Sequence, residues 1–236
     1  MLVSAHSSRG RSPLACAGLA VLLACTSAGG LVGCQTTREA YYNAWENFGG
    51  YAKRERLVDN VKSASKAQEE AKQQFTSALE QFKSVVNFDG GDLEKMYKKL
   101  NDEYEDCESR ADTVRSRIAS VKNVATALFG EWKTEIAEIS DPSLKSRSQQ
   151  LMDKTRGSYD QLVARMDSAA ASMDPVLRSF KDRTLFIKHN LNARAIASLK
   201  GTEMELGQEI DALIRQMETS IAEADKFIAE LNAKGS

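Results

Sequence analysis

The chain has 236 residues, of which 42% are hydrophobic and 28% are charged, and these proportions exclude a wholly disordered protein. Its formal net charge of -1 gives no cationic excess to displace phosphate counterions, so we expect no nucleic-acid partner. Only three prolines occur, which favours long helices.

The N-terminus has the pattern of an export signal. Arg9 and Arg11 are the only Lys, Arg, Asp or Glu residues before Cys34, and residues 14–32 are apolar or small. A basic region followed by an apolar one predicts a secretory signal peptide at residues 1–33. Residues 14–32 are also about long enough to span a bilayer, so an uncleaved membrane anchor is the alternative interpretation.

The residues before Cys34 favour cleavage. Leu31, Val32 and Gly33 form the predicted signal cleavage motif, an aliphatic residue at −3 and a small residue at −1. The motif resembles the lipobox of bacterial lipoproteins, and this implies that Cys34 is the lipid attachment site, carrying acyl chains such as palmitate. Cys25 is a second candidate, but the leucines before it fit the lipobox less well. Three acyl chains would hold the protein firmly, because each buried CH₂ contributes about 0.8 kcal/mol.

Gln35 follows the acylated cysteine. By resemblance to the sorting pattern of Gram-negative lipoproteins, a residue other than Asp here implies the periplasmic face of the outer membrane, within the cell envelope. Once residues 1–33 are removed and Cys34 is acylated, only Cys107 remains as a thiol. We therefore expect no intrachain disulfide, even in an oxidising compartment.

Residues 34–54 are predicted to form a tether and a short aromatic helix. Tyr41, Trp45 and Phe48 have the i, i+4, i+7 spacing of one helix face, with Tyr42 beside them. So close to a lipid anchor, these four side chains form a candidate membrane-interface site. The alternative, which we favour, is that they dock onto the rest of the protein.

Residues 55–234 are predicted to fold as an all-α domain, an elongated antiparallel bundle of about four long helices with coiled-coil-like seams. Apolar residues recur with alternating spacings of four and three, as in a heptad seam. Short turn signals separate the seams, which indicates antiparallel neighbours with a left-handed supercoil. The predicted helices span about 55–87, 91–139, 142–189 and 192–233.

Two boundaries depend on prolines. Pro142 suits the first turn of a helix, and Ser140 or Asp141 can cap it. Pro175 removes one backbone hydrogen bond inside the third helix, so the break between the third and fourth helices could fall at 174–175. A break at 189–192 is the alternative that we prefer, because Asn190 and Asn192 favour a turn there.

The sequence predicts no catalytic residues, no metal site and no cofactor. His189 is the only histidine after Cys34, and it is expected to be a cation at a helix end. The turn at residues 87–92 lacks the glycine and glutamate positions of a calcium loop. Cys107 lies on a seam and is expected to be a small core residue. Thr155 and Ser158 occupy seam-like positions and could line a cavity between helices.

Two segments carry a resemblance to a known family: residues 71–106, AKQQFTSALEQFKSVVNFDGGDLEKMYKKLNDEYED, and residues 186–199, FIKHNLNARAIASL. With them, about residues 40–233 resemble an uncharacterised family of bacterial lipoproteins catalogued as domain of unknown function 2959. The resemblance implies an envelope protein with a helical fold, and it assigns no catalytic residues.

Three functions compete. The first, which we favour, is a non-catalytic structural or protein-interaction module, anchored to the membrane through lipid on Cys34, with a protein partner or self-association through its helix surfaces. The second is a membrane-active bundle, although charges interrupt every seam and leave no spanning segment. The third is an enzyme or small-ligand binder that uses a cavity between helices.

Overall fold

The computed structural model describes residues 51–88 and 92–233. The chain divides into two compact units, residues 1–40 and residues 41–236, and every described residue belongs to the second. Its helices are α2 (Tyr51–Val86), α3 (Leu93–Glu138), α4 (Pro142–His189), α5 (Ala193–Ser198) and α6 (Thr202–Ala233). These residues include no strand, and the prediction of an all-α bundle is confirmed.

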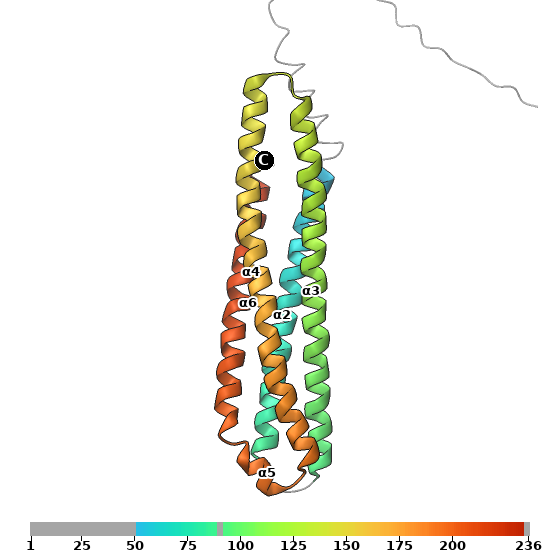
Figure 1. The fold of residues 1–236 in the computed structure, drawn as a ribbon, viewed down its shortest axis with the longest axis vertical. Helices are drawn as coiled ribbons and strands as arrows, with labels where there is room; N and C mark the ends of the chain where they lie inside the picture. Colours follow the sequence, from blue (N-terminus) through green and yellow to red (C-terminus); the bar gives the residue numbers. More distant parts are fainter. Residues whose placement is uncertain (1–50, 89–91, 234–236) are drawn as a thin grey trace, which may run out of the picture. The chain divides into compact units, whose positions relative to one another are not determined.

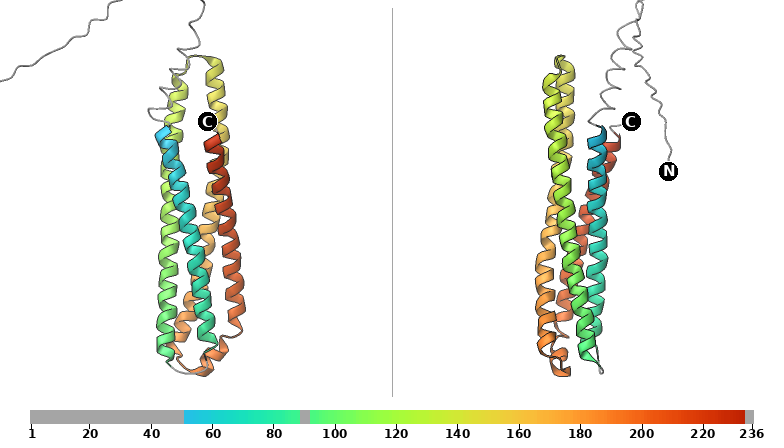
Figure 2. Two further views of the ribbon diagram at one scale, coloured as in Figure 1. Left: turned by 180° about the vertical axis from the view of Figure 1, so that it is seen from behind. Right: turned by 90° about the vertical axis from the view of Figure 1, so that its right-hand side faces the viewer.

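The four long helices lie side by side and alternate in direction (Figures 1 and 2). Helix α2 packs against α3 and α6, and α4 packs against the same two helices. The helices therefore form a closed ring of neighbours in the order α2, α3, α4, α6. The first and last long helices of the chain are adjacent, and short α5 lies at the end of the bundle where α4 passes to α6.

The core consists of the seam positions that the heptad spacing predicts. On α2 every predicted seam residue is buried, from Leu57 to Val85. On the other helices the side chains at the ends of the seams, such as Leu93 and Leu144, are only half-buried. Each apolar side chain that is fully removed from water stabilises the fold by roughly 1.5–3 kcal/mol. The largest fully buried side chains are aromatic: Phe75, Phe82, Phe180 and Phe227.

Aspartates cap two of the helices. Asp92 accepts a hydrogen bond from the backbone N–H of Lys95 at 3.0 Å, before α3. Asp141 accepts from the backbone N–H groups of Ser143 and Leu144 at 2.8 and 3.0 Å, and Pro142 follows it as the first helical residue. These bonds satisfy donors that lack a partner within the helix.

Helix α4 continues through Pro175 and ends at His189. The proline is exposed, and so is Ala171, whose carbonyl loses its helical donor, so water can solvate the orphaned group. The prediction of one helix over 192–233 was wrong. After the turn at Asn190, α5 ends at Ser198 and a second turn precedes α6. Gly201, a poor helix former, lies in that second turn.

One layer of the core is polar. The Ser220 hydroxyl on α6 donates to Gln68 Oε1 on α2 at 3.0 Å, and both residues are fully buried. The Gln68 Nε2 atom has no hydrogen-bond partner among the described residues. Gln68 is the one polar residue at the seam positions between Leu57 and Val85, and heptad spacing within one helix gives no sign of its partner on α6.

Candidate functional site

The site residues predicted near the N-terminus lie outside the described residues. They are the lipid attachment site Cys34, the cleavage motif Leu31, Val32 and Gly33, and the aromatic residues Tyr41, Tyr42, Trp45 and Phe48. They remain predictions. The remaining candidates are the reactive side chains of the bundle and the surfaces on which it could bind a partner.

Residues 51–88 and 92–233 hold no group of His, Cys, Asp and Glu side chains arranged to bind a metal ion. Cys107 is fully buried, and burial raises the pKa of its thiol, which keeps it protonated and unreactive. His189 is exposed in the last turn of α4, at the helix-end position that the sequence predicts.

The two hydroxyls expected to line a cavity are engaged elsewhere. Thr155 is buried and donates to the Leu151 carbonyl at 2.8 Å. Ser158 donates to Glu230 of α6 at 2.7 Å and so joins two helices. A depression of about 370 Å³ lies between α3 and α4, but it is open to solvent. Two of its charged lining residues, Arg115 and Asp174, pair with each other.

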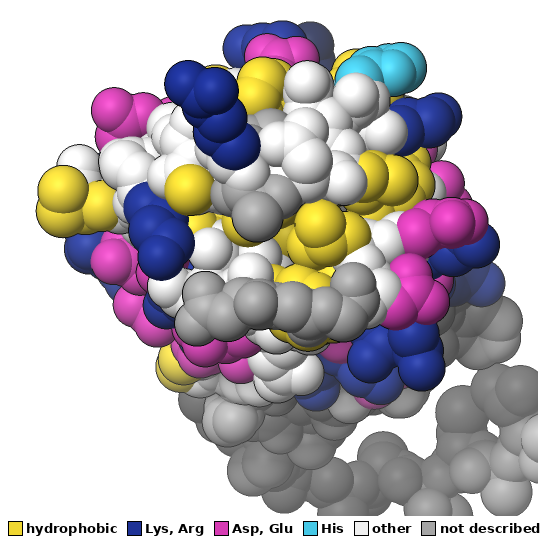
Figure 3. All heavy atoms as spheres, turned by 90° about the horizontal axis from the view of Figure 1, so that it is seen from below, with side chains coloured by type: hydrophobic (Ala, Val, Ile, Leu, Met, Phe, Trp, Pro, Cys, Tyr) yellow, Lys and Arg dark blue, Asp and Glu magenta, His cyan; other side chains and the backbone are white. Residues whose placement is uncertain are grey.

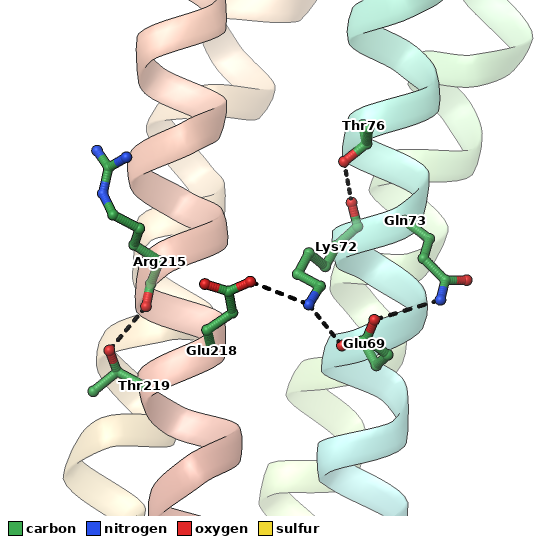
Figure 4. Close-up of polar contacts among 7 residues, drawn as sticks. All are labelled: Glu69, Lys72, Gln73, Thr76, Arg215, Glu218 and Thr219. Carbon is green, nitrogen blue, oxygen red and sulfur yellow. Dashed lines mark hydrogen bonds and ion pairs between the residues drawn. The ribbon is translucent and has the colours of Figure 1, made fainter.

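The sides of the bundle carry ion pairs that link neighbouring helices. Figure 4 shows Lys72 of α2 between Glu69 of the same helix, at 2.9 Å, and Glu218 of α6, at 3.4 Å. Hydrogen bonds from the ammonium group, first to Glu69, raise the pKa of Lys72. Arg110 of α3 similarly reaches Glu70 at 2.7 Å. Each such exposed pair contributes at most about 1 kcal/mol, so these flanks read as solvated faces that help to align helices.

The end of the bundle at α5 is different. All four large hydrophobic side chains that are exposed in the described part of the chain lie within residues 185–204: Leu185, Phe186, Leu191 and Met204, at 42%, 39%, 39% and 70%. They come from the end of α4, the turn before α5 and the first turn of α6. The view onto this end in Figure 3 shows exposed hydrophobic side chains with Lys, Arg, Asp and Glu side chains around them.

The same segment is basic. Residues 183–200 contain four Lys or Arg residues and no Asp or Glu. Lys188, Arg194 and Lys200 are exposed, whereas Arg183 is half-buried and pairs with Glu205 at 3.4 Å. We define the α5 end as the four exposed hydrophobic residues together with Lys188, Arg194 and Lys200. Apolar area surrounded by cations is typical of a contact surface rather than of a solvated helix end.

The opposite end carries charges of both signs, with acids gathered in one segment. Lys53 of α2 pairs with Glu131 of α3, and α3 continues for about two more turns before it ends at Glu138. Helix α4 likewise begins more than four turns before Ser158, which contacts Glu230 near the end of α6. The α3–α4 hairpin therefore extends past the described ends of α2 and α6 (Figure 2). Its segment 131–141 carries four carboxylates and one lysine.

Sequence reasoning did not find the α5 end. The segment FIKHNLNARAIASL was noted for its resemblance to a family, and the turn within it was noted as a break. The available signal was the run of cations without acids, interleaved with leucine and phenylalanine. Heptad periodicity could not show which apolar residues would stay exposed, because the helix break changes which face each residue presents.

Residues 41–231 match the family described as "Protein of unknown function (DUF2959)", and the chain belongs to that family. The match covers the whole bundle, including the α5 end. No curated protein matches the chain. The family gives no activity to transfer, so the functional argument depends on the surfaces described above.

Proposed function

We propose that this protein is a lipid-anchored component of the bacterial cell envelope and acts as a non-catalytic interaction module. Cys34 carries the lipid, and the bundle displays the α5 end to a partner. The observation that carries the proposal is the concentration of exposed large hydrophobic side chains at one end of an otherwise well-buried heptad core. Exposed apolar area gathered in one place is a feature of interaction sites.

The path of the chain supports this arrangement. Helix α2 begins at the end of the bundle opposite α5, and its 36 residues span roughly 54 Å. The chain therefore enters the bundle at one end, through α2, and the contact surface is at the other end. No helix among the described residues is both long and apolar enough to cross a bilayer.

The anchor is tested by metabolic labelling with radioactive palmitate. We expect label in the wild-type protein and none in Cys34→Ala, whereas the control Cys25→Ala should label normally. Because Cys25 lies in the part of the signal that is removed, its loss should not alter acylation. Equal labelling of Cys34→Ala and wild type would contradict the proposed anchor.

The contact surface is tested by photo-crosslinking in cells. A crosslinking residue at Leu191 is expected to give a defined adduct, and the same residue at Gln161, an exposed position in the middle of α4, should give little. Adducts of equal yield at both positions would argue against a dedicated surface at the α5 end.

A further inference from the structure

We propose that the partner of the α5 end is the surface of an anionic phospholipid bilayer. This inference deepens the proposed function by naming the partner of the same surface, and it rests on that function only for the choice of surface. It does not require the acyl anchor, because the residues concerned are all in the bundle.

The apolar residues suit shallow insertion. Leu185, Phe186, Leu191 and Met204 are exposed by 39–70%, yet they belong to three separate local structures. Each of the four lies at a helix end or in a turn, so the end can place single side chains among lipid headgroups and upper acyl chains without spanning the bilayer. A fluid lipid surface adapts to such scattered protrusions.

The exposed cations of the α5 end favour lipid headgroups with a negative charge. Lys188 follows Leu185 and Phe186 by less than one helical turn, Arg194 lies on α5, and Lys200 lies in the turn before α6. Each Lys or Arg near an anionic membrane surface adds favourable electrostatic free energy. The carboxylates nearest in sequence are Asp182, Glu203 and Glu205, and Glu205 already pairs with Arg183. The three exposed cations therefore remain available for phosphate groups.

A second copy of the chain is a weaker candidate. Its acidic hairpin segment 131–141 would complement the cations of the α5 end. It would not complement the apolar side chains, because the structure describes no exposed large hydrophobic side chain outside residues 185–204. An anionic phospholipid supplies both negative charge and apolar chains, and so matches both properties of this surface.

The test is flotation with vesicles, using the whole mature chain from residue 34 with Cys34→Ser, so that no acyl chain contributes. Vesicles of phosphatidylcholine alone are compared with vesicles that also contain phosphatidylglycerol. We expect binding to the anionic vesicles that exceeds binding to the neutral ones by at least about ten-fold and that weakens as salt is added.

Two variants address the surface itself. Lys188→Glu/Arg194→Glu/Lys200→Glu reverses the exposed cations, and Leu185→Ser/Phe186→Ser removes apolar contact. Each should reduce binding to anionic vesicles by about ten-fold or more. The matched control is Arg117→Glu/Lys154→Glu/Arg165→Glu, which reverses three exposed cations of α3 and α4 away from the α5 end and should bind like wild type. Thermal unfolding followed by circular dichroism confirms that each variant folds.

Three outcomes would overturn the proposal. The first is a wild-type chain that does not float with anionic vesicles. The second is equal binding by the surface variants and wild type, which would assign lipid binding elsewhere, for example to the aromatic residues 41–48. The third is that the wild-type chain does not float with vesicles but associates with itself or with an acidic protein, and that the surface variants abolish this association. Failure of palmitate labelling at Cys34 would remove the anchor and leave this vesicle result unaffected.

Discussion

The two ends of the bundle have cores that follow the same heptad spacing, but their exposed residues differ in kind. At the α5 end all four long helices are present, and exposed leucine, phenylalanine and methionine stand beside cations. At the opposite end α3 and α4 continue as a hairpin whose segment 131–141 is mainly acidic. Buried apolar residues follow the heptad at both ends, for example Ile136 near one and Ile187 near the other.

The difference teaches where the fold constrains the sequence. Packing dictates the seam positions, because a polar group placed there would lose its hydration. Packing does not dictate the residue types at the outer positions, and at the hairpin end of the bundle these positions are occupied by ordinary solvated residues. Nothing in the packing requires Leu185 or Phe186 to be apolar, and their exposure at one end is the basis on which we propose a contact surface there.

The largest expected effect compares core substitutions near the two ends. Phe180 is 1% exposed, and its ring meets Phe82 and Tyr104 edge-on, with centroids 6.3 and 5.9 Å apart. Phe180→Ala should lower the free energy of unfolding by about 3–5 kcal/mol. Ile136→Ala should cost about 2 kcal/mol, because Ile136 lies where the α3–α4 hairpin extends past the end of α6 and the site can collapse. Urea unfolding of both variants measures the difference, and equal losses would show that the hairpin is packed as firmly as the four-helix region.

A smaller change is expected between the two ends, in the polar layer of Gln68 and Ser220. Gln68→Leu should raise the free energy of unfolding by about 1–2 kcal/mol, because it removes a buried amide N–H that has no partner. The Ser220 hydroxyl can then donate to its own helix backbone. The control is Gln68→Leu/Ser220→Ala, which removes both members of the pair. A loss of stability in both variants would mean that the pair contributes more than its unpartnered amide costs.

The exposed residues of the α5 end should matter little to stability. Leu185→Ser/Phe186→Ser is expected to change the free energy of unfolding by no more than about 0.5 kcal/mol, because neither side chain is in the core. The neighbouring Ile187 is 1% exposed, and Ile187→Ser should cost about 3 kcal/mol or more. If the double variant melted as early as Ile187→Ser, the two exposed residues would be part of the core after all.

The smallest expected change in the free energy of unfolding is at the end formed by the α3–α4 hairpin, and it depends on pH. Burial, followed by repulsion from Glu131, raises the pKa of Glu135 above its ordinary value of 4.5. The charged carboxylate therefore costs stability at neutral pH, and the cost disappears as pH falls from the raised pKa to below 4.5. Glu135→Gln should stabilise by a few tenths of a kcal/mol at pH 7 and by less at pH 4. Melting temperatures at the two pH values test this, and Glu138→Gln on the exposed face is the control.

The fold was largely predictable because its rule is local. Heptad spacing identified the buried face of each long helix, and the Asp141–Pro142 pair identified a helix start. The connection between α4 and α6 was less predictable. Asn190 and Asn192 indicated one turn, but the second turn at Gly201 depends on how α5 packs across the end of the bundle, and no local spacing encodes that contact.

The candidate site was predictable in a different way. The motif before Cys34 resembles a lipobox, and because this resemblance is a pattern of sequence, the proposal of an anchor there needs no knowledge of the fold. The α5 end is a surface, and its members Leu191 and Met204 come to the same end of the bundle only because the chain reverses between α4 and α6. Sequence periodicity describes faces of one helix, and a surface assembled from three elements is outside its reach.

The adjacency of the first and last long helices has a mechanical consequence. Helix α2 begins and α6 ends at the same end of the bundle, away from α5. A tension applied between Tyr51 and the α5 end would run parallel to the helix axes. To yield, α2 would have to slide past α3 and α6, shearing many buried side chains and ion pairs such as Lys72–Glu218 at once. Because these contacts would have to break together and not one after another, the bundle resists extension along its axis.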